Sequence, residues 1–170
     1  YSDNSTATIT QAPNTHNDTA LIDQLGAGNS NATITQQNTS LTGGSVATIN
    51  QQSDSSSATI TQNLSHNTLA TINQLGNANT ASISQDDTWN ASATINQDGS
   101  GHNASINMVP VSDGSHATVN QYGTNQTAMV DIHGTSNNVT VTQDGDANRA
   151  DVRLNGHHNS SNVSQNGTGN

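Results

Sequence analysis

Aspartate next to glycine is the pattern in this sequence that most resembles a ligand-binding site. The segments Asp98-Gly99, Asp113-Gly114 and Asp144-Gly145-Asp146 offer carboxylate oxygens, which are ligands that calcium prefers. Calcium-binding β-solenoids, however, carry Gly-Gly-x-Gly-x-Asp in tandem, and this sequence does not contain that pattern. Asp-Gly is also a frequent turn dipeptide. We therefore interpret these segments as turns and predict no metal site.

Catalytic patterns are missing as well. Glycan-cleaving solenoids need clustered carboxylates in a cleft, whereas the twelve acidic residues here are all Asp and are scattered along the chain. The sequence has no Gly-rich phosphate loop, no Ser-His-Asp order and no Cys nucleophile. We predict no enzymatic activity and no cofactor. The seven histidines show no ligand spacing, and we expect them to be solvent-exposed loop residues: His16, His66, His102, His116, His133, His157 and His158.

Glutamine, in contrast, recurs at a fixed place. A five-residue unit that reads Ala-x-Ile-x-Gln, with looser variants in the second half, occurs fourteen times in the 170 residues. The spacing varies between the copies and never within them. The copies span residues 7–11, 20–24, 32–36, 47–51, 58–62, 70–74, 81–85, 93–97, 104–108, 117–121, 128–132, 139–143, 150–154 and 161–165.

Strict alternation of apolar and polar residues predicts a half-buried β-strand for each copy. Ala, Ile or Val, and Gln would face inward, while Thr, Asn and Ser would face outward. The residue two positions before each Ala shares the inner face and is usually small and polar. A helix is excluded because residues i, i+2 and i+4 do not lie on one helical face.

The links between the copies alternate in kind, and this pairs the strands. Most second strands are followed by a short Gly-bearing turn, where Gly supplies backbone angles that other residues resist. The other links are irregular. One rung is therefore two strands and about 22 residues, which divides the single repeat domain 1–170 into approximate rungs 1–28, 29–54, 55–77, 78–100, 101–124, 125–146 and 147–170. The turn glycines are Gly26, Gly76, Gly99, Gly123, Gly145 and Gly167.

This pattern predicts an all-β fold, a flat two-sheet β-solenoid of about seven two-strand rungs and fourteen strands, with cross-β stacking at ~4.8 Å. Inward amides in register would hydrogen-bond to their equivalents above and below. A buried amide is costly unless paired, so such ladders also disfavour register slips. The predicted ladders contain Gln11, Gln24, Gln36, Gln51, Gln62, Gln74, Gln85, Gln97, Gln121, Gln143 and Gln165, beside Ile9, Ile22, Ile34, Ile49, Ile60, Ile72, Ile83, Ile95 and Ile106.

Two further columns support rungs of two strands. Three copies of the unit lack the final Gln and end in Met108, Ile132 or Leu154 instead. Each of these copies is the first strand of its rung, and the three rungs are successive. We therefore expect the three residues to form one apolar patch on one sheet. Asp131 and Arg153 would likewise occupy the same outward column on adjacent rungs, where opposite charges attract.

Composition restricts the class of protein. Only 28% of the residues are hydrophobic and 2% aromatic, which is typical of a disordered chain unless a repeat builds a thin core from a few residues per unit. The net charge of −10 argues against nucleic-acid binding, which needs a basic surface. No run of about 20 apolar residues is present, so we expect no membrane insertion. A chain that starts at Tyr1 rather than Met is consistent with processing.

The segment Gln74-x-Gly76-x-Ala78-Asn79-x-Ala81-x-x-x-Gln85 resembles the curlin repeat, whose pattern is Gln-x-Gly-x-Gly/Ala-Asn-x-Ala-x-x-x-Gln. Residues 143–150 match the same pattern, although Leu154 replaces the final Gln, and residues 165–170 match as far as the sequence continues. The resemblance implies a secreted bacterial subunit that forms an extracellular cross-β fibre of the biofilm matrix. It also implies partners: further copies of the chain, a nucleator subunit, and secretion or chaperone proteins.

Polymerisation is also expected from the ends of the sequence, since neither end shows a capping element that would block an exposed strand edge. We expect head-to-tail assembly. The alternative function is ice binding, because outward threonines such as Thr8 and Thr10 recur as Thr33/Thr35 and Thr59/Thr61. Thr is, however, also a common solvent-facing strand residue. An ice-binding protein would remain a stable monomer.

Overall fold

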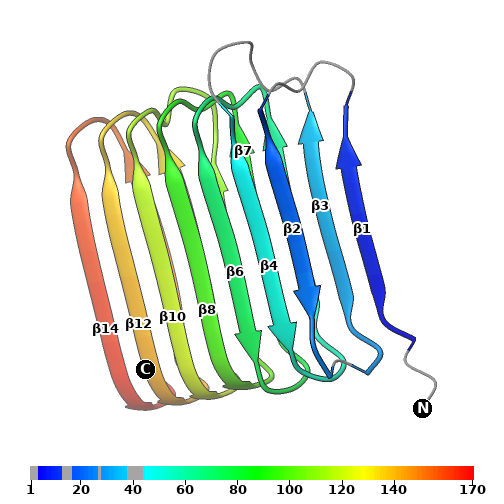
Figure 1. Ribbon diagram of the computed structural model, residues 1–170. Coiled ribbons are helices and arrows are strands. Elements are labelled where there is room, and N and C mark those ends of the chain that lie inside the picture. The colour runs from blue at the N-terminus through cyan, green and yellow to red at the C-terminus, as the bar shows by residue number, and fades with distance from the viewer. Residues whose placement is uncertain (1–3, 13–16, 27, 38–43) are drawn as a thin grey trace.

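The structure of the protein is a computed structural model that describes residues 4–12, 17–26, 28–37 and 44–170. The chain forms fourteen β-strands there, and each contains one copy of the five-residue unit. The odd-numbered strands form one seven-stranded sheet and the even-numbered strands form the other. Figure 1 shows the strands of the two sheets as two rows in a flat stack. The predicted fold, a two-sheet β-solenoid with two strands per rung, is confirmed.

The two sheets are named here by the parity of their strands. The odd sheet consists of β1 (Thr6–Gln11), β3 (Asn31–Gln37), β5 (Ser57–Asn63), β7 (Thr80–Asp86), β9 (Asn103–Met108), β11 (Thr127–His133) and β13 (Arg149–Asn155). The even sheet consists of β2 (Thr19–Gln24), β4 (Val46–Gln52), β6 (Leu69–Leu75), β8 (Ser92–Ser100), β10 (His116–Thr124), β12 (Asn138–Asp146) and β14 (Ser160–Thr168).

Neighbouring strands in each sheet pair in parallel and in register. Equivalent residues of the repeat lie opposite one another, as in Ile34↔Ile60 on the odd sheet and Gln51↔Gln74 on the even sheet. In-register pairing follows from the alternation itself, because a slip by one residue would move every apolar side chain to the outer face.

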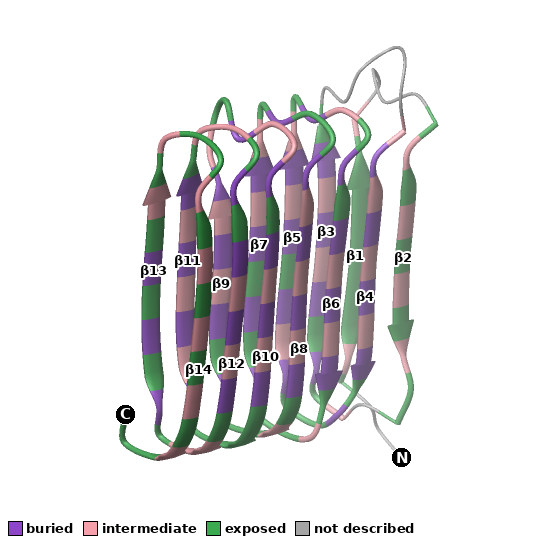
Figure 2. Cartoon of the chain, turned by 90° about the vertical axis from the view of Figure 1, so that its left-hand side faces the viewer, coloured by how far each residue is buried: buried purple, intermediate pink, exposed green. Residues whose placement is uncertain are grey.

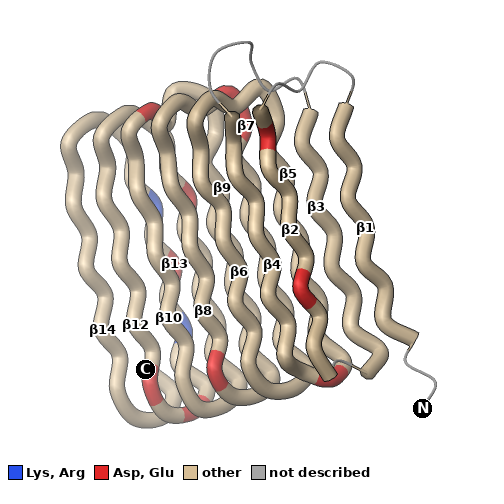
Figure 3. Tube along the Cα trace, viewed as in Figure 1, with Lys and Arg blue, Asp and Glu red and all other residues tan. Residues whose placement is uncertain are grey.

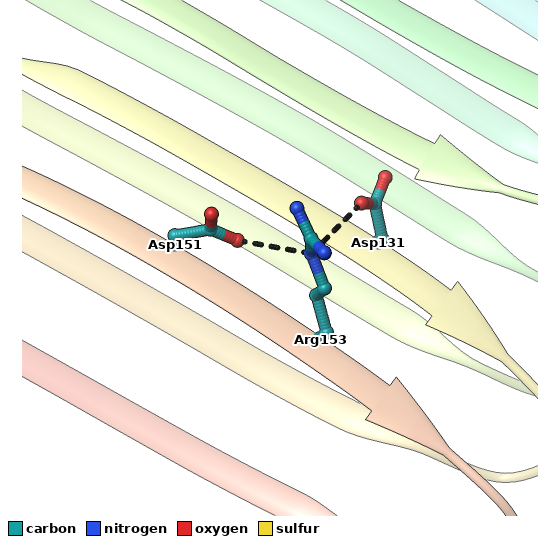
Figure 4. A network of polar contacts seen from close by, with 3 residues as sticks. All are labelled: Asp131, Asp151 and Arg153. Carbon is teal, nitrogen blue, oxygen red and sulfur yellow. Dashed lines mark ion pairs between the residues drawn. The ribbon is translucent and has the colours of Figure 1, made fainter.

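The two columns that the sequence assigned to the odd sheet are also in register. Ile132 pairs with both Met108 and Leu154, so the three residues that replace Gln form the predicted contiguous patch. Asp131 pairs with Arg153, whose Nε lies 3.6 Å from Asp131 Oδ2 and 3.4 Å from Asp151 Oδ1 (Figure 4). The Arg153 side chain is 71% exposed, so this network contributes little to stability.

The core is a thin seam between the two sheets. Figure 2 shows buried and more exposed residues alternating along the strands of the inner rungs. The buried apolar residues are mainly one Ala and one Ile or Val from each strand, and Ile34, Ile49, Ile60, Ile72 and Ile95 are all 0% exposed. This arrangement agrees with the inner face that the alternation predicts.

Burial is incomplete at the first rung, although the alternation assigns Ile9 and Ile22 to the inner face. Ile9 is 47% exposed and every residue of β1 is exposed, while Ile22 on β2 is only half-buried. β1 and β2 are edge strands that pair on one side only, which leaves their side chains open to solvent on the other side. Burial is lost less completely at the other end of the odd sheet, where Ala150 and Val152 of the edge strand β13 are 5% and 7% exposed.

The part of the chain that the structure describes contains no helical segment that could span a membrane.

The assignment of the strand faces can be tested at two adjacent residues of β6. Ile72 is fully buried, whereas Thr71 is partly exposed on the outer face. Ile72→Asp should destabilise the fold by about 4 kcal/mol or more, because it buries an unpaired carboxylate. Thr71→Asp should cost about 1 kcal/mol or less. Urea unfolding followed by circular dichroism measures both, and equal losses would contradict the assignment.

Candidate functional site: the stacked amides

The longest row of identical polar side chains is the glutamine ladder of the even sheet. The Nε2 of each Gln donates to the Oε1 of the Gln in the next rung, at 2.7–3.0 Å. The same Nε2 also donates to a backbone oxygen at the start of the preceding odd strand, for example from Gln97 to Thr80 O at 2.9 Å. Both amide hydrogens are therefore used, one along the stack and one across the seam. This ladder contains Gln24, Gln51, Gln74, Gln97, Gln121, Gln143 and Gln165.

The glutamine ladder of the odd sheet is shorter. It runs from Gln11 through Gln36 and Gln62 to Gln85, with N–O distances of 2.8–2.9 Å. Gln85 Nε2 then lies 3.8 Å from Met108 Sδ, which is a weak acceptor. Beyond Met108 the column continues with Ile132 and Leu154. The structure thus brings together all the glutamines assigned to each ladder, and it ends the odd-sheet ladder at the apolar patch.

A second kind of ladder lies just before the odd strands, at the position two residues before each Ala. Here the side chain of one rung accepts a hydrogen bond from the backbone N–H of the next rung. Asn79 N, for example, donates to Ser56 Oγ at 3.1 Å, and Asn148 N donates to Gln126 Oε1 at 3.1 Å. The sequence indicated that this position faces inward, but it did not indicate the bond to the next rung. The column consists of Ser5, Ser30, Ser56, Asn79, His102, Gln126, Asn148 and Asn170.

His102 occupies this column, and the expectation that it is an exposed loop residue is wrong. The residue is 1% exposed. Its Nδ1 lies 3.3 Å from Gln126 N and accepts that N–H, so the neutral ring carries its proton on Nε2, 3.4 Å from Asp98 O. Burial lowers the pKa of His102 from its ordinary value, and this outweighs the opposing effects of the Asp98 backbone oxygen and carboxylate. A neutral His therefore stands where the neighbouring rungs of this column carry Asn79 and Gln126.

The glycine turns allow the rungs to approach closely. Gly76, Gly99, Gly123 and Gly145 have positive φ, and a Cβ on any of them would overlap the carbonyl oxygen of the glycine in the next rung. Gly167 continues the column by pairing with Gly145. Gly26 is different, because its φ of 67° is also left-handed but a Cβ there would contact nothing within 4 Å.

A comparable close approach between glycines, in the links that follow odd strands, was not predicted from the sequence. Gly134 has a φ of 106°, and its Cβ would overlap the carbonyl oxygen of Gly156. Both residues lie in links that follow odd strands, and these links look irregular when read one at a time. Alignment of the link after β11 with the link after β13 would have shown the repeated glycine.

A third row of amides lies on the outer face of the even sheet. Asn50, Asn73, Asn96 and Asn120 are linked by Nδ2-to-Oδ1 hydrogen bonds of 2.7–2.8 Å. We call this the outer asparagine row. The sequence identified these residues as outward-facing, but it did not identify the ladder that they form.

The chemistry of these groups is hydrogen bonding between equivalent residues. Within the described part of the chain, no group of three or more His, Cys, Asp or Glu side chains could hold a metal ion. The two sides of a rung are complementary: the glutamine amides donate toward the following rung, and the backbone N–H groups of the second column donate toward the preceding one. Such a surface can template the addition of another copy of itself.

Comparison with known families identifies the repeat. The model for the curlin associated repeat matches residues 113–145 and 134–167, which include β10 to β13 and most of β14. Together the matches cover about a third of the chain, and they confirm the resemblance seen in the sequence. No curated protein matches the chain.

The even-sheet ladder can be tested at Gln74, which accepts from Gln51 and donates to Gln97 and to Ser57 O. Gln74→Leu should destabilise the fold by about 2–4 kcal/mol, because it leaves buried partners unsatisfied although it adds apolar surface. Gln52→Leu, at the exposed residue that follows the ladder residue Gln51 of the preceding rung, should change stability by about 0.5 kcal/mol or less. Urea unfolding measures both values. A neutral Gln74→Leu variant would show that apolar packing alone is sufficient.

A pH dependence should follow from His102. Its pKa is lower in the folded state than the ordinary value of 6.5, so the unfolded chain binds more protons as the pH falls below about 6.5. The contribution of His102 to stability should therefore be complete above that pH and decrease toward its lower folded-state pKa. His102→Asn restores the residue found at Asn79 and Asn148. The stability difference between this variant and the unmodified chain should depend on pH across that window, and a constant difference would contradict the assignment.

Proposed function

We propose that this chain, whose residues 113–167 are curlin associated repeats, is a structural subunit that stacks end to end into an extracellular cross-β fibre. The observation that carries the proposal is the even-sheet ladder, which passes through all seven rungs without interruption. On the even sheet every rung offers the same amide to its neighbours. A terminal rung therefore offers a second copy what an interior rung already uses.

The direction of the ladders supports head-to-tail contact. All glutamine bonds run from Nε2 of one rung to Oε1 of the following rung. The first rung consequently presents amide oxygens, and Gln165 in the last even strand presents an N–H. Head-to-tail stacking joins a donor to an acceptor, whereas head-to-head stacking would place oxygen against oxygen.

The repeat family supports an extracellular setting. We propose that the fibre lies outside the cell, where it scaffolds a biofilm matrix and mediates adhesion. Its partners would be further copies of the chain, a nucleator subunit and proteins of secretion. The role is structural, and it requires no catalytic group or cofactor.

Ice binding was the alternative, and the arrangement of the outer threonines favours it less. On the odd sheet the paired threonine columns extend only from β1 to β5, and Ser82 and Ser84 replace them in β7. On the even sheet a single threonine column lies beside the outer asparagine row. A broad, regular threonine surface is therefore limited to three of the fourteen strands.

The proposal predicts that the purified chain polymerises at neutral pH. Unbranched fibres should be visible by electron microscopy, and fibre diffraction should give a repeat of ~4.8 Å along the axis. Gln24→Leu removes the acceptor that the first rung offers to another copy, so it should slow elongation about tenfold while the circular dichroism of the fresh protein stays unchanged. Gln37→Leu, an exposed residue of β3, is the matched control and should elongate normally. A chain that stays monomeric for days at high concentration, without a thioflavin signal, would contradict the proposal.

A further inference from the structure

A groove with a volume of about 410 Å³ crosses the outer face of the even sheet. It extends from β2 to β10 and therefore passes over five consecutive strands, in the direction of stacking. Four strand spacings of ~4.8 Å give it a length of roughly 19 Å. The residues that line it are Asp23, Asn50, Gln52, Asn73, Leu75, Asn96, Gln97, Asp98 and Tyr122.

One side of the groove is the outer asparagine row. Asn73 accepts from Asn50 and donates to Asn96, and each of these bonds uses one of two amide hydrogens or one of two oxygen lone pairs. The second hydrogen and the second lone pair of each amide stay available. The row therefore offers a donor and an acceptor at every strand spacing, which suits a ligand that carries hydroxyl groups at regular intervals.

The other side of the groove is formed by the next outward column, which contains Leu75, Asp98 and Tyr122. Leu75 is 44% exposed and Tyr122 is 41% exposed. This column lies two residues along the strand from the asparagine row, or about 6.6 Å. Tyr and Leu offer apolar surfaces against which the C–H face of a sugar ring can pack, while the amides bond to its hydroxyls.

The charge of the groove selects among extended ligands. Asp23 and Asp98 line it from strands three positions apart, and no Lys or Arg does. Both arginines of the chain, Arg149 and Arg153, lie in β13 of the odd sheet. Figure 3 shows acidic residues on strands of the even sheet as well as at the links. With a net charge of −10, the chain disfavours anionic ligands and attracts cations.

We propose that this groove binds an extended glycan with protonated amino groups, a polymer of amino sugars. Its ring faces would pack on Leu75 and Tyr122, its hydroxyls would bond to the asparagine row, and its ammonium groups would lie near Asp23 and Asp98. A basic peptide would satisfy the carboxylates but would not provide hydroxyls for the amide row. The groove lies within a single chain, so the proposal does not depend on the fibre.

The test uses freshly purified, monomeric chain and an oligosaccharide of six β-1,4-linked glucosamine units, at a pH where its amines are protonated and the aspartates are ionised. Titration followed by NMR should shift the Asn73, Asn96 and Tyr122 signals. The fully N-acetylated hexamer should bind about tenfold more weakly, because it keeps the rings and loses the charges. Hexalysine should also bind more weakly, and its affinity should not depend on Tyr122.

Two variants and a control localise the site. Asp98→Asn should weaken binding of the glucosamine hexamer about fivefold, and Tyr122→Ala about threefold to tenfold. Asp87→Asn makes the same charge change at an exposed link residue outside the groove and should leave binding unchanged. Equal losses from the Asp98 and Asp87 variants would show nonspecific charge attraction and overturn the proposal. Hexalysine binding that is equally tight and equally sensitive to Tyr122→Ala would overturn the glycan assignment in favour of a peptide.

Discussion

In-register stacking of parallel rungs requires that each inward polar group find its partner in the rung above or below. The glutamines meet this requirement through their amides, and the position before each odd strand meets it by accepting a backbone N–H of the next rung. Buried Gln and Asn are costly when unpaired, but here the stacking itself supplies the partner. This is why a chain with only 28% hydrophobic residues can form an ordered core.

The same requirement explains where the repeat changes. A substituted residue must be compatible with its neighbours in the stack as well as with its own strand. Met108, Ile132 and Leu154 replace Gln in three adjacent rungs, so only Gln85 meets an apolar neighbour, and it keeps a bond to Leu69 O at 3.3 Å. His102 is tolerated alone because its ring accepts the N–H that an Asn side chain would accept. Substitutions in the ladders therefore either occur together in adjacent rungs or preserve the hydrogen bond between rungs.

Much of the fold could be predicted from the sequence because one local pattern determines which face of each strand is buried. The strands, the two-strand rung and the apolar patch all follow from it. Interactions between rungs were harder to predict, since they depend on aligning the links as well as the strands. His102 lies two residues before Ala104, which is the position already assigned to the interior, so its burial could have been predicted. The close approach of Gly134 to Gly156, and the exposure of Ile9, appear only when the rungs are stacked.

The two sheets would not contribute equally to contact between copies. When residues 1–170 of one copy stack head to tail on another, the N–H of Gln165 meets the amide oxygen of Gln24, and the even-sheet ladder continues. On the odd sheet Leu154 would face Gln11, whose oxygen finds no donor there. An acceptor left without a partner at this joint weakens the contact on one side. The proposed stacking of copies would therefore depend mainly on the even sheet, the sheet that also carries the outer asparagine row and the groove.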